Sequence, residues 1–341
     1  MQRVTIKDIA RLAGVSVTTV SRALNHGPEI SPETRERILR ICREEGYRTN
    51  LLARSLISSR TNVLGLILPD IANPFHAALS FNIETYAREL GYQVMLCSGR
   101  PGDGQIESLI DFLIGQRVDG ILLSSANDQA RYLLRRYRDV LPAVLLGACV
   151  PEASGIRANA VSTDNFVGGR IAAEYFHRLG HRDVVYLGLR RGSVTHTLRH
   201  GGFLAAAREL DMQVTTVENP GPASSISSGY QMARRLFASP LTQTALFAAS
   251  DAVALGVIQA ADEAGIAIPE RLSILGFDDI EYAALPNIRL STLSRNTALM
   301  ARASVRLLLE LVDSDSRDEY TSKLITPTLV ERATCAPPYS G

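Results

Sequence analysis

Apolar residues in the first fifty positions recur with helical spacing in three short stretches. The first, residues 6–13, has apolar side chains at i, i+3, i+4 and i+7 and follows Thr5, a good N-cap. The second follows Ser16, and the third begins at Ser31 with Pro32 in its first turn. This pattern predicts a small all-α domain of three helices.

From residue 62 onward, short apolar runs alternate with longer amphipathic stretches. The apolar runs are Val63–Leu68, Val94–Cys97, Gly120–Leu123, Ala143–Leu146, Val184–Leu187, Ala245–Ala248 and Ile274–Phe277. The amphipathic stretches include Phe75–Leu90, Phe166–Leu179, Val253–Ala264 and Leu299–Leu311. Buried parallel strands joined by helices give this alternation, so we expect an α/β, doubly wound body over residues 62–341. Residues 49–61 contain no glycine or proline and predict a short helix between this body and the helical head of residues 1–48.

The composition fits a chain that folds throughout. Of 341 residues, 46% are hydrophobic and 21% are charged, and the length is enough for two or more hydrophobic cores. The formal net charge of +1 hides an asymmetry. Residues 1–60 carry eleven Arg and Lys against six Asp and Glu, a net charge of +5, whereas the remainder carries 25 against 29, a net charge of −4. A cationic head suits a polyanion such as nucleic acid, although a solvated basic surface would give the same charge.

The sequence lacks the motifs of the common α/β enzymes. It has no GxSxG, no Walker loop and no GxGxxG, and Gly99–Gly104 has the wrong spacing for the last of these. The pairs His177/His181 and His196/His200 have the spacing of one helical turn but lack the glutamate and the third ligand of a metal site. The four cysteines lie far apart in the chain. We therefore expect no catalysis, no metal and no cofactor.

The N-terminal residues alternate charged and apolar side chains and lack the apolar core of an export signal. The sequence also has no apolar span of about twenty residues. These features predict a cytoplasmic protein with no membrane partner. They argue against a transport solute-binding protein, which would carry an export signal and no cationic head.

Residues 16–22, Ser-Val-Thr-Thr-Val-Ser-Arg, meet the requirements of the DNA-reading helix of a helix-turn-helix. Such a helix enters the major groove with small or hydrogen-bonding side chains at its start and apolar residues behind them. Further motifs of the head are Thr5-Ile6-Lys7-Asp8-Ile9-Ala10, Ala13-Gly14-Val15-Ser16 and Thr19-Val20-Ser21-Arg22. The body adds Pro69-Asp70, Asn73-Pro74-Phe75, Val118-Asp119-Gly120, Gly276-Phe277-Asp278 and Leu329-Val330-Glu331-Arg332. Through these motifs nearly the whole chain resembles the LacI/GalR family of bacterial repressors.

The resemblance implies different roles for the residues of the head. Base edges would be read by Val17, Thr18 and Arg22, and phosphates would be bound by Thr5, Ser16, Thr19, Ser21, Asn25 and Asn50. The chemistry agrees, because an arginine can donate twice to guanine and Val17 can contact a thymine methyl group. Capping or solvation is the alternative for each hydroxyl.

The resemblance also implies a hinge helix at residues 50–58, which orders on operator DNA and inserts Leu56 between the central base pairs. Ordinary helix packing is the alternative for Leu56. Thr49 stands where the family usually has proline, so the first residue of the hinge helix stays open.

The body of the family resembles a periplasmic sugar-binding protein, in which two lobes joined by three crossings hold a ligand at the C-terminal ends of strands. The N-lobe would comprise about residues 62–161 and 293–323, and the C-lobe about residues 162–290 and 324–341. The effector-binding residues implied are Asn73, Phe75, His76, Asp164, Ser193, Thr195, Arg199, Asp251 and Asp278. Each carboxylate lies between a strand and a helix, so an N-cap is the alternative, and for Asp251 it is equally favoured.

The effector implied is a small molecule, a sugar or a sugar derivative. Many relatives have an aromatic residue before the segment 228–230, where this chain has Ala223-Ser224-Ser225. Stacking against a sugar face would then be weaker, or would come from Phe75.

Four basic side chains near the presumed effector site, His76, Arg190, Arg191 and His196, could favour an anionic ligand such as a sugar phosphate or sugar acid. Arg190 and Arg191 could equally be solvated loop charges. The sequence leaves the two interpretations open.

These inferences together predict a bacterial DNA-binding transcription regulator, in the first place a repressor, that associates with the nucleoid when bound to its operator. A palindromic double-stranded DNA operator requires a two-fold pair of heads, so we expect a homodimer built by the body. The tail after Thr334 has no heptads, which argues against a coiled-coil tetramer.

Overall fold

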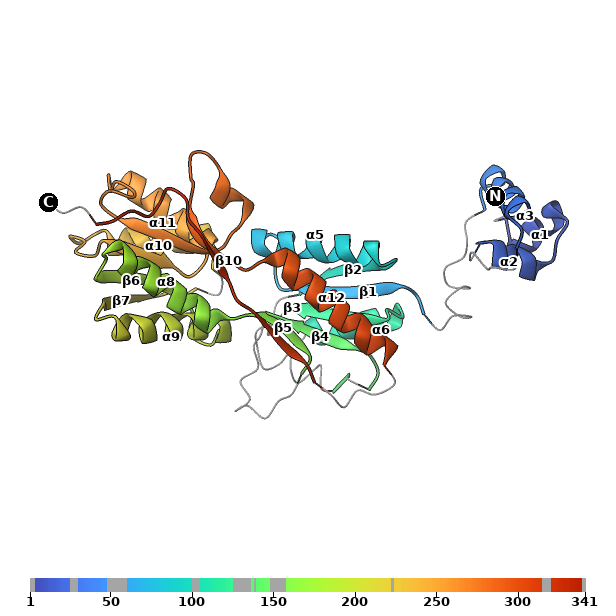
Figure 1. The fold of residues 1–341 in the computed structure, drawn as a ribbon, viewed down its shortest axis with the longest axis horizontal. Coiled ribbons are helices and arrows are strands. Elements are labelled where there is room, and N and C mark those ends of the chain that lie inside the picture. The colour runs from blue at the N-terminus through green and yellow to red at the C-terminus, as the bar shows by residue number, and fades with distance from the viewer. Residues whose placement is uncertain are drawn as a thin grey trace. The chain divides into compact units, whose positions relative to one another are not determined.

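The computed structural model describes residues 4–24, 30–47, 60–99, 105–124, 136–137, 139–147, 158–221, 224–314 and 320–338. It divides into two compact units, Met1–Thr61 and Asn62–Gly341 (Figure 1). The predictions for Asn25, Asn50, Leu56 and residues 49–59 of the hinge lie outside the described residues.

The first unit contains the three expected helices, α1 (Ile6–Ala13), α2 (Val17–Leu24) and α3 (Pro32–Glu44). Thr5 begins α1 with a capping box, because its hydroxyl accepts from the amide of Asp8 while the Asp8 carboxylate accepts from the amide of Thr5. Gly14 ends α1 in the left-handed conformation, at φ 64°. The fully buried Ile9, Val20 and Ile38 come from the three different helices and form the centre of the core.

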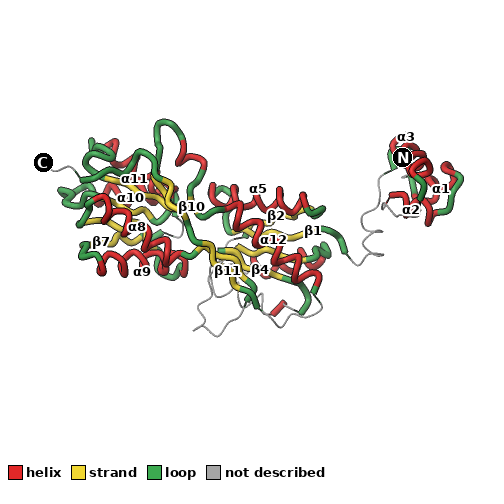
Figure 2. Tube along the Cα trace, in the orientation of Figure 1, coloured by secondary structure: helices red, strands yellow, loops and turns green. Residues whose placement is uncertain are grey.

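The described strands of the second unit form two six-stranded sheets, which define its N-lobe and C-lobe (Figure 2). The N-lobe sheet has the order β11-β5-β4-β3-β1-β2, and all its pairs are parallel. Its strands are β1 (Val63–Leu68), β2 (Gln93–Ser98), β3 (Gly120–Ser124), β4 (Ala143–Leu146), β5 (Ala160–Thr163) and β11 (Ser322–Ile325). Helices α5 (Pro74–Glu89) and α12 (Thr297–Asp313) cover one face of the sheet, and α6 (Gln105–Gly115) covers the other. The apolar strands are therefore buried from both sides.

The C-lobe sheet has the order β12-β10-β9-β8-β6-β7, and only β12 is antiparallel to its neighbour among the described strands. Its strands are β6 (Asp183–Leu189), β7 (Gln213–Glu218), β8 (Ala245–Ala248), β9 (Ser273–Asp278), β10 (Ser291–Ser294) and β12 (Thr328–Val330). Helices α8 (Asn165–Leu179) and α9 (Val194–Glu209) lie on one face, and α10 (Ile226–Leu236) and α11 (Asp251–Glu263) lie on the other. The expected two-lobed, doubly wound architecture with a helical head is confirmed.

The chain crosses between the lobes three times, after Thr163, after Ser294 and after Ile325. The approximate lobe boundaries expected from the sequence lie within a few residues of these crossings. Strand β5 continues to Thr163 because it pairs with β11 to its end, and β10 belongs to the C-lobe sheet because it pairs with β9.

Helices α8 and α9 pack backbone to backbone through two glycines. A Cβ atom on Gly169 would lie 2.0 Å from the carbonyl oxygen of Arg199, and one on Gly202 would lie 1.9 Å from the carbonyl oxygen of Phe166. Helices α10 and α11 use Gly229 and Gly256 in the same way. Only glycine allows this approach, so these residues fix the spacing of the two helix pairs.

No helix in the described part of the chain is both long enough and apolar enough to span a membrane.

Candidate functional site

The outward face of α2 carries the side chains that the sequence assigns to base reading. Val17 is 41% exposed, and Thr18 and Arg22 are also exposed. Val20 and Ala23 point the opposite way, into the core of the head. The helix therefore presents a short apolar side chain, a hydroxyl and a guanidinium group on one surface, and this surface has the chemistry needed to contact base edges.

The described residues assigned to phosphates lie at helix starts or beside this face. Thr5 caps α1, and the Ser16 hydroxyl accepts from the amide of Thr19 at 3.0 Å. Capping therefore accounts for one bond of each hydroxyl, although both residues are exposed. Thr19 and Ser21 are half-buried on α2.

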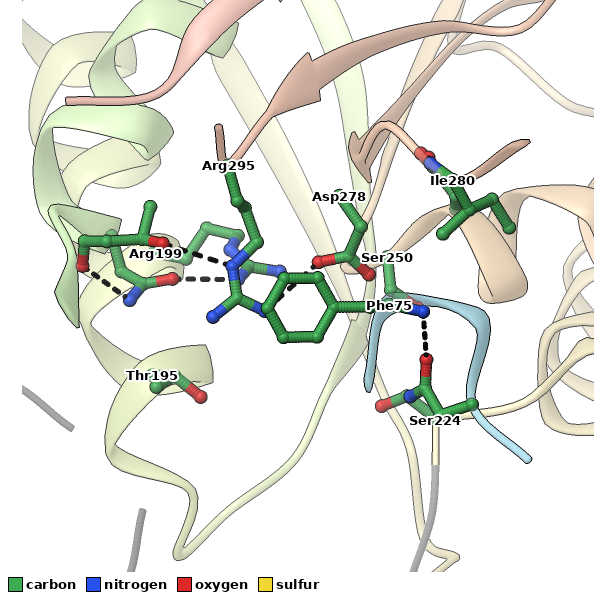
Figure 3. Close-up of polar contacts among 12 residues, drawn as sticks. Phe75, Thr195, Arg199, Ser224, Ser250, Asp278, Ile280 and Arg295 are labelled. Carbon is green, nitrogen blue, oxygen red and sulfur yellow. Dashed lines mark hydrogen bonds and ion pairs between the residues drawn. The ribbon is translucent and has the colours of Figure 1, made fainter. Parts of the chain in front are cut away.

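A cluster of buried polar side chains joins the two lobes of the body, and its centre is Arg295 (Figure 3). Arg295 lies in the crossing between β10 and α12, and its Nε donates to the hydroxyl of Thr163 at 3.1 Å. Its Nη1 donates to Asp278 at 3.3 Å, and its guanidinium carbon lies 3.6 Å from the centre of the Phe75 ring. Since Phe75 is on α5 of the N-lobe and Asp278 ends β9 of the C-lobe, this one side chain contacts both lobes. We call Phe75, Thr163, Asn165, Arg199, Asp278 and Arg295 the interlobe cluster.

Arg199 lies on α9 and is only 3% exposed. It donates to the carbonyl oxygen of Ala249 and, at 2.7 Å, to the side chain of Asn165 on α8. Its guanidinium group also packs over the Phe277 ring, 3.3 Å from the ring centre. Burial lowers the pKa of Arg199 to about 10, so the group stays charged at neutral pH. The close packing of α8 and α9 thus holds this cation in the interior.

The two buried carboxylates of this region have different surroundings. Asp278 ends β9 with φ 131°, and burial raises its pKa while Arg295 and Arg199 lower it. Asp251, in the first turn of α11, accepts from the amide of Ile280 at 2.9 Å and from the hydroxyl of Thr292 at 2.5 Å. Burial raises the pKa of Asp251 to about 7, and the nearby charge of Asp278 adds to this. Asp251 is therefore engaged within the protein, and the helix cap beside it is Ser250.

Two histidines lie next to these charges, the half-buried His76 and the buried His196. The Nδ1 atom of His76 lies 2.9 Å from the carbonyl oxygen of Asp70, and burial lowers the pKa of His76. The Nδ1 atom of His196 lies 3.1 Å from the carbonyl oxygen of Gly188. Burial and the charges of neighbouring arginines lower the pKa of His196 to about 3. Both rings are therefore neutral at pH 7, and Nδ1 carries the proton because a carbonyl can only accept.

The remaining predicted residues lie at helix starts. Asn73 caps α5 by accepting from the amide of Phe75, and Asp164 caps α8 by accepting from the amide of Val167. Ser193 precedes α9 and makes no side-chain cap, and its hydroxyl lies 3.1 Å from that of Thr195. The capping interpretation therefore describes Asn73 and Asp164 in this structure.

The two adjacent arginines of the loop after β6 differ in their surroundings. Arg191 is 82% exposed and pairs with Glu218, as expected for a solvated loop charge. Arg190 is half-buried, and burial lowers its pKa. No carboxylate in the described part of the chain lies within ion-pair distance of Arg190.

The sequence did not identify Arg295, Asn165 or Thr163 as site residues. A signal exists for Arg295, because it directly follows the strand Ser291–Ser294 and so lies at the C-terminal edge of the sheet. The strand itself is short and polar, which hid the signal. Among the described residues no group of three metal-ligating side chains lies together.

Comparisons with known proteins cover both units. Residues 5–50 match the model of the bacterial regulatory proteins of the lacI family, and residues 173–335 match a periplasmic binding protein-like domain. The chain is 29% identical over 332 residues to the HTH-type transcriptional repressor PurR of Mannheimia succiniciproducens, covering 96% of this chain and 97% of the relative. It is 27% identical to the ribose operon repressor of Escherichia coli, covering 96% and 98%.

Two solved structures extend the comparison to three dimensions. The lac repressor dimer bound to operator and the anti-inducer ONPF has a TM-score of 0.87 at 26% identity, covering 98% of this chain and all of that one. The complex of the transcriptional regulator CelR with cellobiose has a TM-score of 0.71 at 28% identity, covering 97% and 100%. Head and body match this architecture together, and the chain belongs to the LacI family of DNA-binding transcriptional regulators, a non-enzymatic family, with a periplasmic-binding-protein-like effector domain.

Proposed function

We propose that this protein is a repressor that binds a palindromic operator as a homodimer and responds to a small effector, a sugar or sugar derivative, bound between the lobes of its body. A repressor of this kind acts in the cytoplasm, where the DNA is. The observation that carries the proposal is the exposed face of α2, with Val17, Thr18 and Arg22 turned away from the core of the head.

Each side chain of this face fits one kind of base contact. Arg22 can donate two hydrogen bonds to guanine, Val17 can pack on a thymine methyl group, and Thr18 can donate or accept. Phosphate contacts by Thr5, Ser16, Thr19, Ser21, Asn25 and Asn50 would fix the register of the head on the duplex. The minor-groove role of Leu56 rests on the resemblance.

The interlobe cluster supports the effector site. Arg199 and Asp278 come from different elements of the C-lobe, and Phe75 reaches them from the N-lobe through Arg295. The related CelR structure holds cellobiose, and a LacI family regulator from Enterococcus faecium, 26% identical with a TM-score of 0.68, holds ribose. We therefore assign Phe75, His76, Arg199 and Asp278 to effector contacts, with Ser193 and Thr195 as hydroxyl donors. Asn73, Asp164 and Asp251 would act by positioning the loops that carry these contacts.

Exposed apolar side chains of the N-lobe support a homodimer. Phe81 on α5 is 68% exposed, and Leu96 on the edge strand β2 and Ile71 in the loop before α5 are also exposed. Such side chains are typical of an interface. The solved lac repressor that this chain resembles is a dimer on its operator.

A selection from randomised operators at fixed salt tests the DNA reading. Arg22→Ala should weaken binding by about 1 to 3 kcal/mol per half-site and relax selection at one base pair of each half-site. Arg40→Ala is the matched control, because Arg40 lies on the solvent side of α3 next to Glu44. If Arg22→Ala keeps every base preference of the wild type, the assignment of α2 as the reading helix is wrong.

A further inference from the structure

The region around the interlobe cluster holds more positive than negative charge. Arg190, Arg199 and Arg295 come from three different elements, and each side chain is at least partly buried. Asp278 is the one described carboxylate that makes an ion pair with any of them, at 3.3 Å from Arg295. Asp251 also lies near Arg199, but burial raises the pKa of Asp251 to about 7, so this carboxyl group carries only part of a negative charge at neutral pH.

Aromatic and carbonyl contacts account for only part of the stabilisation that these cations need. Arg199 packs over Phe277 and donates to Ala249, and Arg295 packs over Phe75. These contacts are weaker than a buried ion pair, and a buried charge without a counterion is costly. The Nε atom of Arg199 is buried without a hydrogen-bond acceptor among the described residues.

The neighbouring histidines neither add to nor offset this charge. His196 lies close enough to Arg199, Arg190 and Arg295 for their charges to lower its pKa, and its ring stays neutral. The Nε2 atom of His196 lies 3.5 Å from the Ser224 hydroxyl, and the segment Ala223-Ser224-Ser225 contains no aromatic side chain. This side of the region is therefore polar and does not provide a stacking surface.

We infer that the effector is an anion, a sugar acid or sugar phosphate, whose acidic group is bound by the guanidinium groups of Arg190, Arg199 and Arg295. This inference rests on the proposed effector site and specifies the ligand class that the site takes. An acidic group would supply the missing countercharge, and its oxygens would accept from nitrogen atoms that lack acceptors. Guanidinium groups bind carboxylates and phosphates through paired, charge-assisted hydrogen bonds.

Arg190 is the arginine through which this inference is tested most directly. It is the least buried of the three and has no carboxylate partner among the described residues, so its removal disturbs few internal contacts. The adjacent Arg191 provides a matched control, because it carries the same charge but pairs with Glu218 at the surface.

The experiment measures thermal unfolding and binding calorimetry of the full-length protein with matched sets of ligands. The probes are glucose, galactose and ribose, each compared with its sugar acid and its phosphate ester. We expect at least one acidic member to raise the unfolding temperature while its neutral parent does not. Arg190→Gln should weaken binding of that member by about 10- to 100-fold, and Arg191→Gln should leave it unchanged. A response to the sugar acid or to the phosphate ester distinguishes the two sources of negative charge.

Three results would overturn the inference: a neutral sugar that binds as tightly as its acid, an unchanged affinity in Arg190→Gln, or no binding by any acidic probe. If a neutral sugar binds and alters operator affinity, the anionic class is wrong while the proposed function stands. If an acidic probe binds through Arg190 but leaves operator affinity unchanged, the anionic class stands while the proposed regulation is wrong.

Discussion

At the scale of single residues, Arg199 and Asp278 are held by different means. Arg199 is fixed by Asn165 and the carbonyl oxygen of Ala249, whereas Asp278 has its ion pair with Arg295 and an unusual backbone angle of φ 131°. A non-glycine residue in this region of φ is strained, and such strain tends to occur at functional sites. The loop after β9 therefore places a carboxylate where an ordinary strand end would not.

Arg199→Ala or Asp278→Ala should abolish the response to effector and leave operator binding without effector intact. Each change leaves polar groups of the ligand unpaired, at a cost of about 1 to 3 kcal/mol or more. The measurement is operator binding by fluorescence anisotropy, titrated with the ligand that stabilises the wild type most.

Arg208→Ala is the control, because Arg208 is exposed at the end of α9, the helix that carries Arg199. This variant should respond to the effector like the wild type. A response of either site variant at wild-type ligand concentrations would show that the effector binds elsewhere.

His196 should make the protein less stable in acid. Its pKa falls from 6.5 to about 3 on folding. Between these two pH values the histidine is therefore protonated in the unfolded chain and neutral in the folded protein. Stability is then lost as the pH falls from about 6.5 towards 3, by up to about 1.4 kcal/mol per pH unit. Asp251 acts in the opposite direction between pH 3.8 and about 7, because its raised pKa stabilises the folded protein at the acid end.

The comparison of His196→Gln with the wild type isolates the histidine. Urea unfolding followed by circular dichroism gives the free energy of unfolding at about pH 5 and about pH 7. The decrease in this free energy from pH 7 to pH 5 should be smaller in His196→Gln than in the wild type. His177→Gln, at the half-exposed end of α8, should show the same decrease in the free energy of unfolding as the wild type. Equal losses in all three proteins would contradict the buried, neutral state of His196.

The sequence suggested Phe75 and Asp278 as effector residues through the motifs Asn73-Pro74-Phe75 and Gly276-Phe277-Asp278, and it suggested Arg199 only through the family resemblance. It did not identify Arg295, because nothing in Ser-Thr-Leu-Ser marks a strand that would bring Arg295 to the edge of the sheet. The sequence also could not predict that Arg190 is half-buried while Arg191 is exposed, because this difference depends on the conformation of the loop after β6.

At the scale of elements, the pair α8 and α9 sets the geometry of the Arg199–Asn165 bond. Gly169 and Gly202 allow the two backbones to touch, and the carbonyl oxygen of Arg199 itself lies against Gly169. Any side chain at these positions would push α9 away from α8. The 2.7 Å bond between the two helices would then lengthen.

Gly202→Ala should lower the free energy of unfolding by about 1 to 3 kcal/mol and weaken the effector response, because its methyl group would meet the backbone of Phe166. Gly201→Ala is the matched control, since no atom lies within 4 Å of its added Cβ. That change should be neutral or stabilising by up to about 1 kcal/mol. Thermal unfolding and effector titration of both variants test the prediction, which fails if the two variants are equally stable.

Long apolar runs predicted their strands well, since burial on both faces of a parallel sheet requires such runs. The strands β5, β7, β10, β11 and β12 were not among the predicted apolar runs, because each contains Ser or Thr, and all of them except β7 have only three or four residues. Helix α9 is likewise hard to recognise from its periodicity, because its buried face carries His196, Arg199 and Gly202.

At the scale of the whole molecule, we predict a homodimer. Sedimentation at micromolar concentration should give a dimer, and Phe81→Glu should shift it towards monomer, because a charge would replace an apolar side chain that is exposed in the single chain. Operator affinity should fall with the loss of dimer, since one head reads only one half-site. A wild-type monomer with full operator affinity would contradict the prediction.

The glycine contacts within both helix pairs of the C-lobe limit how this lobe can move. Helices that slide past one another usually do so by switching side-chain rotamers, and contacts between two backbones have no rotamers to switch. Shear within α8/α9 or α10/α11 is therefore blocked, and the C-lobe must turn as a rigid block. A bound effector would then move the C-lobe as a whole relative to the N-lobe, about the three crossings, which carry Asp164, Arg295 and the two residues between β11 and β12.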